Sequence, residues 1–256
     1  MLLGGAAVLS AAGARDAQRF ALSPPGVMAL ALVSSGAMAL VAALASLRPG
    51  VDPVASLRLA RTRTSAAGLL AAIIGMAGLS VACGSIVDLA GGGDLGTMAD
   101  IAHAFERATP AQTALGVLAI GVVPGLAEEA FFRGFIQTRL ASRWGRWPAI
   151  LATAAAFGVM HFDRVQGPVA FVIGLFLGWM VERLGGIRPS MAAHAFNNAL
   201  FILIARAASP GHATRSQGVV AVAAGGVVWI ASAALLASRI AVRPVSDPAD
   251  PGGAGG

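Results

Sequence analysis

Two adjacent glutamates and an arginine stand in an apolar stretch of the sequence, GLAEEAFFRGF at 125–135. Glu129 and Arg133 are four residues apart, so on a helix they share a face and can form an ion pair. Glu128 lies about 140° around the helix from Arg133, at about 100° per residue, so we expect it to point to another surface. A carboxyl group without its own cation is a candidate general acid or base.

Two histidines stand in similar apolar surroundings. Phe157 and His161 are four residues apart in AAAFGVMHFD, which places an aromatic ring one helical turn from an imidazole. His194 and Asn198 repeat this spacing in RPSMAAHAFNN, so an imidazole and an amide share a helix face. Peptide hydrolysis needs a base for water, a donor for the oxyanion and a proton for the leaving amine. With Glu128, these side chains offer all three.

Each pattern also has a plainer interpretation. The two glutamates and Arg133 are compatible with a charged helix outside the membrane, and His161 with a helix end that faces water. His194 and Asn198 are compatible with hydrogen bonds that hold helices together. All three patterns occur in one apolar chain, which favours the catalytic interpretation over these separate ones.

A zinc site is left open by these residue types. Glu128, His161 and His194 offer one oxygen and two nitrogen ligands, the set used by hydrolytic zinc sites. However, the sequence has no HExxH motif, and Asn198 is a better oxyanion donor than zinc ligand. A metal-free mechanism is therefore slightly favoured. No GxSxG or SxxK motif supports a serine nucleophile.

The composition indicates that these residues lie in a membrane protein. Hydrophobic residues make up 57% of the chain and charged residues 12%, with a mean hydropathy of +0.77. An average soluble domain has roughly 25% charged residues. In lipid, only helices or closed barrels satisfy every backbone group, and the apolar segments are too long for barrel strands. We therefore predict an all-α, polytopic integral membrane helical bundle.

The apolar segments predict about seven to eight transmembrane helices, since a span needs about 20 apolar residues. A partial first helix or a signal-peptide core lies in residues 1–14. Seven longer segments run over 26–47, 65–87, 111–138, 148–163, 167–182, 189–206 and 217–241. The domain organisation that follows is an N-terminal segment 1–25, helices and loops 26–110, a catalytic core 111–205, a last transmembrane helix 206–243 and a disordered tail 244–256.

The arginines predict the orientation in the membrane. Alternate loops place 11 of the 18 basic residues, all arginine, on one side and 6 on the other, with Arg133 inside a segment. The positive-inside rule assigns the richer side to the cytoplasm and the loop 88–107 to the outside. This distribution favours a lipid bilayer over nucleic acid as the partner of the basic residues, and we expect no nucleic-acid partner. It therefore accounts for the net charge of +6.

Straight helices do not bring the three patterns to one depth. At about 1.5 Å per residue from the cytoplasmic ends, Glu128 lies about 16 Å deep, His161 about 21 Å and His194 about 9 Å. One catalytic site does not tolerate that spread. Either the segment boundaries differ by several residues, or the helices tilt or break, or the three patterns do not form one site.

In order, Glu128-Glu129-xxx-Arg133, Phe157-xxx-His161 and His194-xxx-Asn198 resemble the three motifs of the CPBP family of CAAX proteases and bacteriocin-processing proteins, also called Abi. Within it, the sequence resembles the type II CAAX prenyl endopeptidases over about residues 111–205. The resemblance implies a helical intramembrane protease, a type described both as a metalloendopeptidase and as a glutamate-dependent enzyme.

The resemblance also implies a role for each motif residue. Glu128 would activate the attacking water with the help of His161, and His194 and Asn198 would stabilise the oxyanion. Structural support of the site would come from the remaining motif residues, Glu129, Arg133 and Phe157.

The function that these inferences favour is an intramembrane endopeptidase acting on a membrane-associated peptide or protein. Abundant Arg, Ala and Gly with no Lys indicates a GC-rich bacterial genome, so we expect a bacterial inner membrane. The alternatives are a non-catalytic immunity or scaffold protein, and a proton-coupled transporter in which Glu128 and His161 relay protons.

Overall fold

The structure is a computed structural model that describes residues 14–47, 49–60, 62, 64–207 and 214–238. Every regular element in these residues is a helix, which confirms the all-α prediction. The expectations for residues 1–13 and for the tail 244–256 lie outside the described residues. The elements are α2 (Ala14–Ala21), α3 (Pro24–Ser46), α4 (Pro53–Ser56), α5 (Ala66–Leu89), α6 (Gly96–Glu106), α7 (Pro110–Gly116), η2 (Val117–Val122), α8 (Val123–Glu128), η3 (Glu129–Gln137), α9 (Thr138–Trp144), α10 (Arg146–Val159), α11 (Gln166–Leu184), α12 (Arg188–Ala207) and α13 (Arg215–Ala237).

Each of the seven long apolar segments forms a helix, but the count of seven to eight membrane spans is not confirmed. Among the described residues, five helices are long and apolar enough to cross a membrane: α3, α5, the continuous helix 110–144, α11 and α13. The other two differ for separate reasons. Helix α10 has only 14 residues, and α12 carries His194, Asn197 and Asn198 in its middle.

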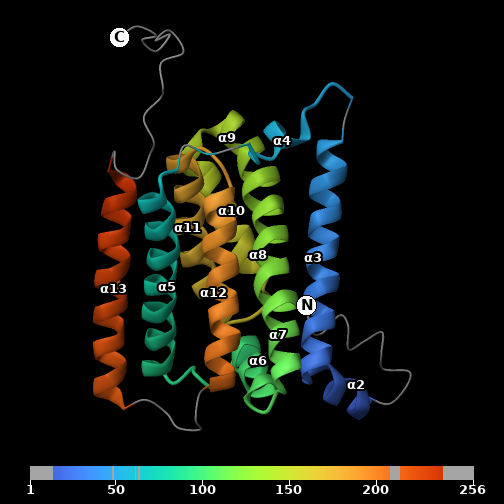
Figure 1. Ribbon diagram of the computed structural model, residues 1–256, viewed down its shortest axis with the longest axis vertical. Coiled ribbons are helices and arrows are strands. Elements are labelled where there is room, and N and C mark those ends of the chain that lie inside the picture. The colour runs from blue at the N-terminus through green and yellow to red at the C-terminus, as the bar shows by residue number, and fades with distance from the viewer. Residues whose placement is uncertain (1–13, 48, 61, 63, 208–213, 239–256) are drawn as a thin grey trace, which may run out of the picture.

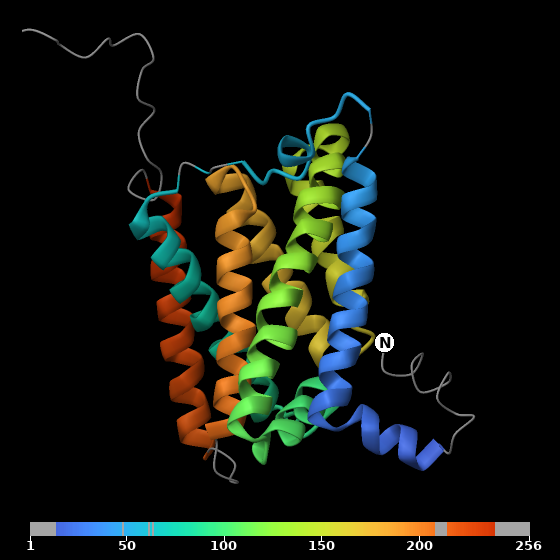
Figure 2. The same ribbon diagram turned by 45° about the vertical axis from the view of Figure 1, so that its right-hand side comes forward.

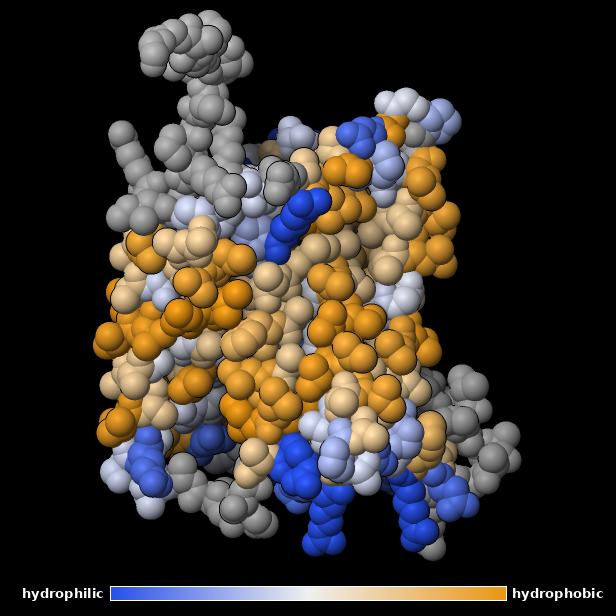
Figure 3. All heavy atoms as spheres, viewed as in Figure 1, coloured by the Kyte–Doolittle hydropathy of each residue, from blue (hydrophilic) through white to orange (hydrophobic). Residues whose placement is uncertain are grey.

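The surface of the bundle has the distribution expected of an integral membrane protein. Hydrophobic side chains cover the middle of the visible face in Figure 3, and hydrophilic ones gather at its two ends. Helices α4 and α9 lie at one end of the bundle, and α2, α6 and the start of α7 lie at the other (Figure 1). A hydrophobic band between two polar rims matches a bilayer and its two interfaces.

The helix that carries the two glutamates contains two π segments, η2 and η3. Proline has no N–H and cannot continue the regular hydrogen-bond ladder, and Pro124 lies two residues after the end of η2. The widened turn is visible at its end, where the Val123 N–H donates to the Leu118 carbonyl five residues back. Inserted π turns occur often at functional sites, and here Glu129 begins the second one.

Helices α10 and α11 form a hairpin in which α10 is too short to cross a membrane. Fourteen residues of α10 span about 21 Å, less than a hydrocarbon core of about 30 Å. The turn between the two helices lies inside the outline of the bundle, short of the end formed by α6 and α7 (Figure 2). Helix α10 ends at Val159, and His161 lies two residues later in this turn. The fourth segment therefore ends earlier than the sequence indicates.

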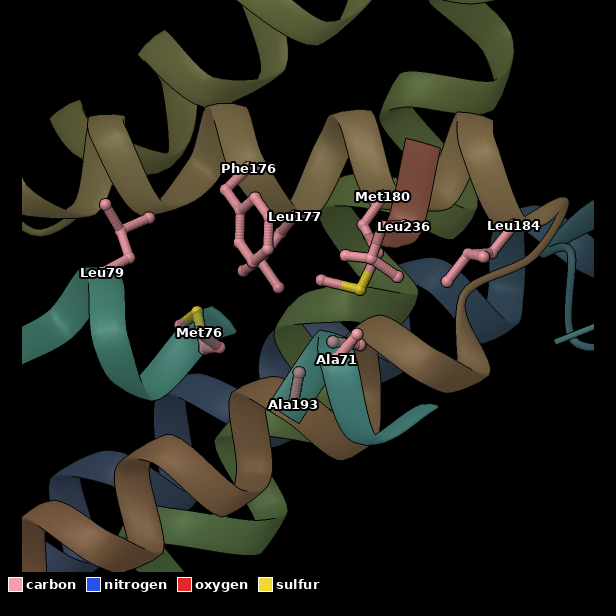
Figure 4. Close-up of a cluster of buried hydrophobic side chains, with 10 residues drawn as sticks. Ala71, Met76, Leu79, Phe176, Leu177, Met180, Leu184, Ala193 and Leu236 are labelled. Carbon is pink, nitrogen blue, oxygen red and sulfur yellow. The ribbon is translucent and has the colours of Figure 1, made fainter. Parts of the chain in front are cut away.

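An apolar cluster joins α5, α11, α12 and α13 (Figure 4). Its large buried side chains include those of Met76, Leu79, Phe176, Leu177 and Met180. Ala193, which is 0% exposed, brings α12 into this cluster. Because His194 follows Ala193, the packing of the cluster holds the helix that carries this imidazole.

Candidate active site

Glu129 and Arg133 form the ion pair that their spacing predicts. The Arg133 Nη1 donates to Glu129 Oε1 over 2.7 Å, and both side chains are 0% exposed. A second nitrogen, Arg133 Nη2, donates to the Gly174 carbonyl of α11 over 3.4 Å. The guanidinium carbon also lies 4.5 Å from the centre of the Phe157 ring. The buried charge of Arg133 is therefore met by a carboxylate, a carbonyl and an aromatic face.

Both glutamates lie beside the same imidazole, which corrects the expectation that Glu128 points to another surface. His194 Nδ1 is 3.1 Å from Glu129 Oε1, and His194 Nε2 is 3.8 Å from Glu128 Oε2. Helical spacing describes only directions around one axis. Here a second helix, α12, places a ring against the point where α8 meets η3, so the two carboxylates contact opposite edges of that ring.

The partners of the two histidines determine which ring nitrogens carry hydrogen. A carboxylate and a carbonyl oxygen can only accept. His194 Nδ1 therefore donates to Glu129 Oε1. His161 Nδ1 donates to the Phe157 carbonyl over 2.7 Å. In the neutral form, each ring then presents the lone pair of its Nε2, and for His194 this atom faces Glu128.

The Phe157 ring joins the second motif to the other two. Its centroid lies 4.8 Å from that of the His161 ring and 5.8 Å from that of the His194 ring, both edge-on. Since Arg133 covers the same ring, the three sequence patterns meet around Phe157. The depths estimated from straight helices are therefore wrong. The short helix α10 places His161 near the site. Helix α12 begins at Arg188, two residues after Gly186, and a Cβ atom added to Gly186 would lie 3.0 Å from the Arg58 carbonyl.

Small residues allow the helices of the first and third motifs to approach each other. A Cβ atom added to Gly125 would lie 2.6 Å from the Ala195 backbone, and one added to Gly121 would lie 2.9 Å from Ala199 Cα. Each pair of small residues is four apart, the arrangement that lets membrane helices touch backbone to backbone. Ala195 is adjacent to His194, and Gly125 is one turn before Glu128 and Glu129. This contact therefore brings the imidazole to the carboxylates.

Asn198 lies on α12 one turn after His194 and is half-buried. A helix places the two on one face, as expected, but no contact in the described residues joins Asn198 to the glutamates. The zinc ligand set is not gathered either. Within the part of the chain that the structure describes, no three His, Cys, Asp or Glu side chains are placed to hold a metal ion. Glu128 and His194 lie together, whereas the ring contact described for both His194 and His161 is with Phe157.

A comparison with protein families bears directly on this arrangement. Residues 110–200 match the family described as type II CAAX prenyl endopeptidase Rce1-like. This match supports the resemblance of the segment to CAAX proteases. The match includes η2, η3, α10, α11 and the first two thirds of α12, so every motif residue named above lies within it. No curated protein and no solved structure matches the chain.

Residues 110–200 thus resemble a protease family, and they lie in a helical bundle with apolar helices. The family match confirms the resemblance to CAAX proteases, and the apolar helices fit an integral membrane protein. The match says nothing of a metal.

Sequence reasoning missed a second buried polar group in this segment. Gln137, 0% exposed, donates from Nε2 to the Gly178 carbonyl over 3.0 Å and to Glu182 Oε1 over 2.9 Å. The same Glu182 oxygen accepts from Arg58 Nη1 over 2.6 Å. Gln137 continues the four-residue spacing of Glu129 and Arg133, and this spacing was the signal available in the sequence. Its two partners lie on α11, more than 40 residues later in the chain, and cannot be inferred from that spacing.

Proposed function

We propose that this protein is an intramembrane endopeptidase that hydrolyses peptide bonds in membrane-associated peptides or proteins. The observation that carries the proposal is the meeting of three separate motifs at His194 and Phe157. Glu128, Glu129 and Arg133 lie on the helix 110–144, Phe157 lies on α10 and His194 lies on α12, yet all contact one small buried region. Buried ionisable groups of this kind are costly inside a membrane and generally serve a function.

In the proposed mechanism, Glu128 accepts a proton from water as the water oxygen attacks the peptide carbonyl. His161, with a free Nε2, assists by accepting a hydrogen bond from the same water. Glu128 is suited to this role because it has no cation of its own, whereas Glu129 is occupied by Arg133. Its side chain is also 17% exposed, so a substrate and water can reach it. The proton then passes to the leaving amine as the carbon–nitrogen bond breaks.

His194 and Asn198 are proposed to hold the oxyanion that forms during the attack. Asn198 offers an amide N–H. His194 must carry a second proton on Nε2 for this role, because Glu129 already fixes the first on Nδ1. The ring then acts as an imidazolium in that step, and Glu129 keeps its orientation. Such donors act on charge that develops only in the transition state.

The experiment is cleavage of a peptide library by the purified protein in detergent, followed by mass spectrometry of the products. Wild type should cleave a subset of peptides, and Glu128→Gln should cleave none. Glu106→Gln changes an exposed glutamate of α6 and is the matched control, expected to retain full activity. The same assay with a chelator tests the metal: unchanged cleavage supports the metal-free mechanism. If wild type cleaves nothing, or Glu128→Gln cleaves normally, the proposal is wrong.

The proposed location is a bacterial inner membrane, with the proteolytic site open to membrane-associated substrates rather than soluble ones. The face seen in Figure 3 is hydrophobic across its middle, which fits a protein that meets its substrates within the membrane.

A further inference from the structure

The turn between α10 and α11 is fastened by one carboxylate, that of Asp163. Its Oδ2 accepts from the Thr97 N–H over 2.6 Å and from the Thr97 hydroxyl over 2.9 Å. Its Oδ1 accepts from the backbone N–H groups of Val165 and Gln166, over 2.7 and 2.8 Å. Asp163 therefore supplies an acceptor to the first turn of two helices at once, α6 and α11. Helix N-termini leave unpaired N–H groups and favour a negative charge.

The contact with α6 depends on a glycine. Gly96 has a φ of +82°, and a Cβ atom there would lie 2.6 Å from Asp163 Oδ2. No other residue type combines that backbone conformation with such a close approach. Thr97 follows directly and supplies both donors. The start of α6 is thus shaped to receive a side chain that comes from a position 66 residues later.

The same turn carries His161, two residues before Asp163. On one side, His161 is tied to α10 through the bond from its Nδ1 to the Phe157 carbonyl. On the other side stands Phe162, whose φ of +50° is unusual for a residue with a side chain. Such a conformation persists only where its surroundings impose it. The residue that follows, Asp163, is the one held by four hydrogen bonds.

The charge state of Asp163 agrees with this arrangement. Burial raises the pKa of Asp163, but backbone hydrogen bonds from Gln166, Thr97 and Val165 lower it by more. The pKa of Asp163 therefore lies below its usual range. The side chain is therefore a carboxylate at neutral pH, the form that accepts all four hydrogen bonds.

We propose that Asp163 is a positioning residue for His161, and that it acts by fastening the α10–α11 turn to α6. The inference rests on the proposed peptidase function for its effect on turnover, but the fastening itself is independent of that function. With the turn fixed on both sides, the His161 ring stays edge-on to Phe157 and its Nε2 keeps one direction. Without Asp163, Phe162 can leave its strained conformation, and His161 would move with it.

Two variants break the contact from opposite sides. Asp163→Asn keeps one oxygen for the α11 amides but turns an NH₂ group toward the Thr97 N–H, where two donors meet. Thr97→Val removes the hydroxyl and keeps the shape of the side chain, and it changes no residue of the turn that carries His161. Thr97→Ser keeps the hydroxyl and is the conservative rescue. Asp100→Asn, another acidic residue of α6, is the matched control.

The first measurement is independent of activity. Hydrogen exchange of the backbone amides in residues 159–167 should become faster in Asp163→Asn and in Thr97→Val, and remain unchanged in Thr97→Ser and Asp100→Asn. Exchange reports local opening of a segment. If exchange in this turn is the same in all four variants, the fastening is wrong, whatever the protein cleaves.

The second measurement is the division between kcat and KM. A displacement of about 1 Å at a catalytic group can cost about 100-fold in rate, so we expect Asp163→Asn to lower kcat by about 10- to 100-fold with KM within about twofold. Thr97→Val should lower kcat by a smaller factor, and the two changes together should cost less than the product of the two. A normal kcat, with only the melting temperature lowered, would show a structural role and overturn the positioning role. If wild type cleaves nothing while exchange changes as expected, the proposed peptidase function fails and the fastening stands.

Discussion

At the scale of single residues, Glu129 has two partners that donate hydrogen bonds to the same oxygen. Its Oε1 accepts from Arg133 Nη1 and from His194 Nδ1, while its side chain is fully buried. Glu128, one residue earlier, lies 3.8 Å from His194 Nε2 and remains partly exposed. The two adjacent glutamates therefore differ in their surroundings: Glu129 is fully buried and holds two other side chains, whereas Glu128 is partly accessible.

This division predicts different outcomes for the two glutamine substitutions. Glu129→Gln leaves Arg133 without a compensating charge, and removing one partner of a buried pair costs about 3–5 kcal/mol. Its melting temperature in detergent should fall clearly, whereas Glu128→Gln should melt near the wild-type temperature. Thermal unfolding of the two purified variants provides the measurement. Equal losses of stability would contradict this division.

Asn198 gives a second prediction at this scale. Removing one oxyanion donor typically lowers kcat by about 10²–10³. Asn198→Ala should show such a loss with KM little changed, because the oxyanion exists only in the transition state. Asn198→Asp should be comparably poor, since a carboxylate repels the oxyanion.

Kinetics, melting and elemental analysis of Asn198→Ala together separate the alternatives. A zinc ligand would lose metal on substitution, and a residue that only joins helices would lower the melting temperature at normal kcat. A normal kcat in the folded variant would refute the oxyanion role.

At the scale of elements, the site depends on how closely α12 approaches the helix 110–144. Gly121 and Gly125 face Ala195 and Ala199 at backbone contact, and the glutamates and His194 lie one turn or less beyond this contact. The distance between these helices therefore determines whether the carboxylates reach the imidazole. The side chains of the site have no freedom to compensate for a wider spacing, because Glu129 and Arg133 are fully buried.

Gly125→Ala should separate these helices. The added Cβ would meet the Ala195 backbone at 2.6 Å, and backbone cannot move aside as a flexible side chain would. We expect a lower melting temperature and a loss of kcat of about 10-fold or more, since small misplacements reduce rates strongly.

Gly84→Ala is the matched control for this change. Gly84 lies within α5, where an added Cβ would meet nothing within 4 Å. Alanine is favoured over glycine in a helix by about 0.5–1 kcal/mol, so this variant should be as stable as wild type or slightly more stable. If Gly125→Ala behaves like Gly84→Ala, the close approach does not control the site.

At the scale of the whole molecule, helices α4 and α9 lie at one end of the bundle and α6 lies at the other (Figure 1). The loops beside α4 and α9 belong to the side that the sequence predicts to be arginine-rich. The α10–α11 hairpin enters from the arginine-rich end and returns to it, so only its turn approaches α6. The site is therefore built from helices that enter from both sides of the membrane.

The orientation predicts the outcome of reporter fusions. A reporter joined after residue 146 should be read as cytoplasmic, and one joined after residue 95 should be read as outside, because 11 arginines lie on the first side and 6 on the second. Activity of alkaline phosphatase and fluorescence of a green fluorescent protein distinguish the two locations. The opposite pattern would reverse the orientation and leave the fold unchanged.

The sequence by itself determined whatever depends on neighbours along one helix. The composition and the apolar segments indicated a helical membrane bundle, and the four-residue spacing of Glu129 and Arg133 allowed their ion pair, because a helix places those positions side by side. The same local geometry placed Phe157 beside His161 and put His194 and Asn198 on one face. The three motifs were sufficient to identify the family.

Only the tertiary structure decided how separate helices meet. The sequence contained no sign that both glutamates contact one imidazole, because this depends on Gly125 packing against Ala195, 70 positions later in the chain. The bond between Asp163 and Thr97 likewise joins two turns that no local spacing relates. Helical periodicity fixes directions around one axis, whereas the contact between two axes depends on the shapes of both surfaces, and those shapes exist only in the folded bundle.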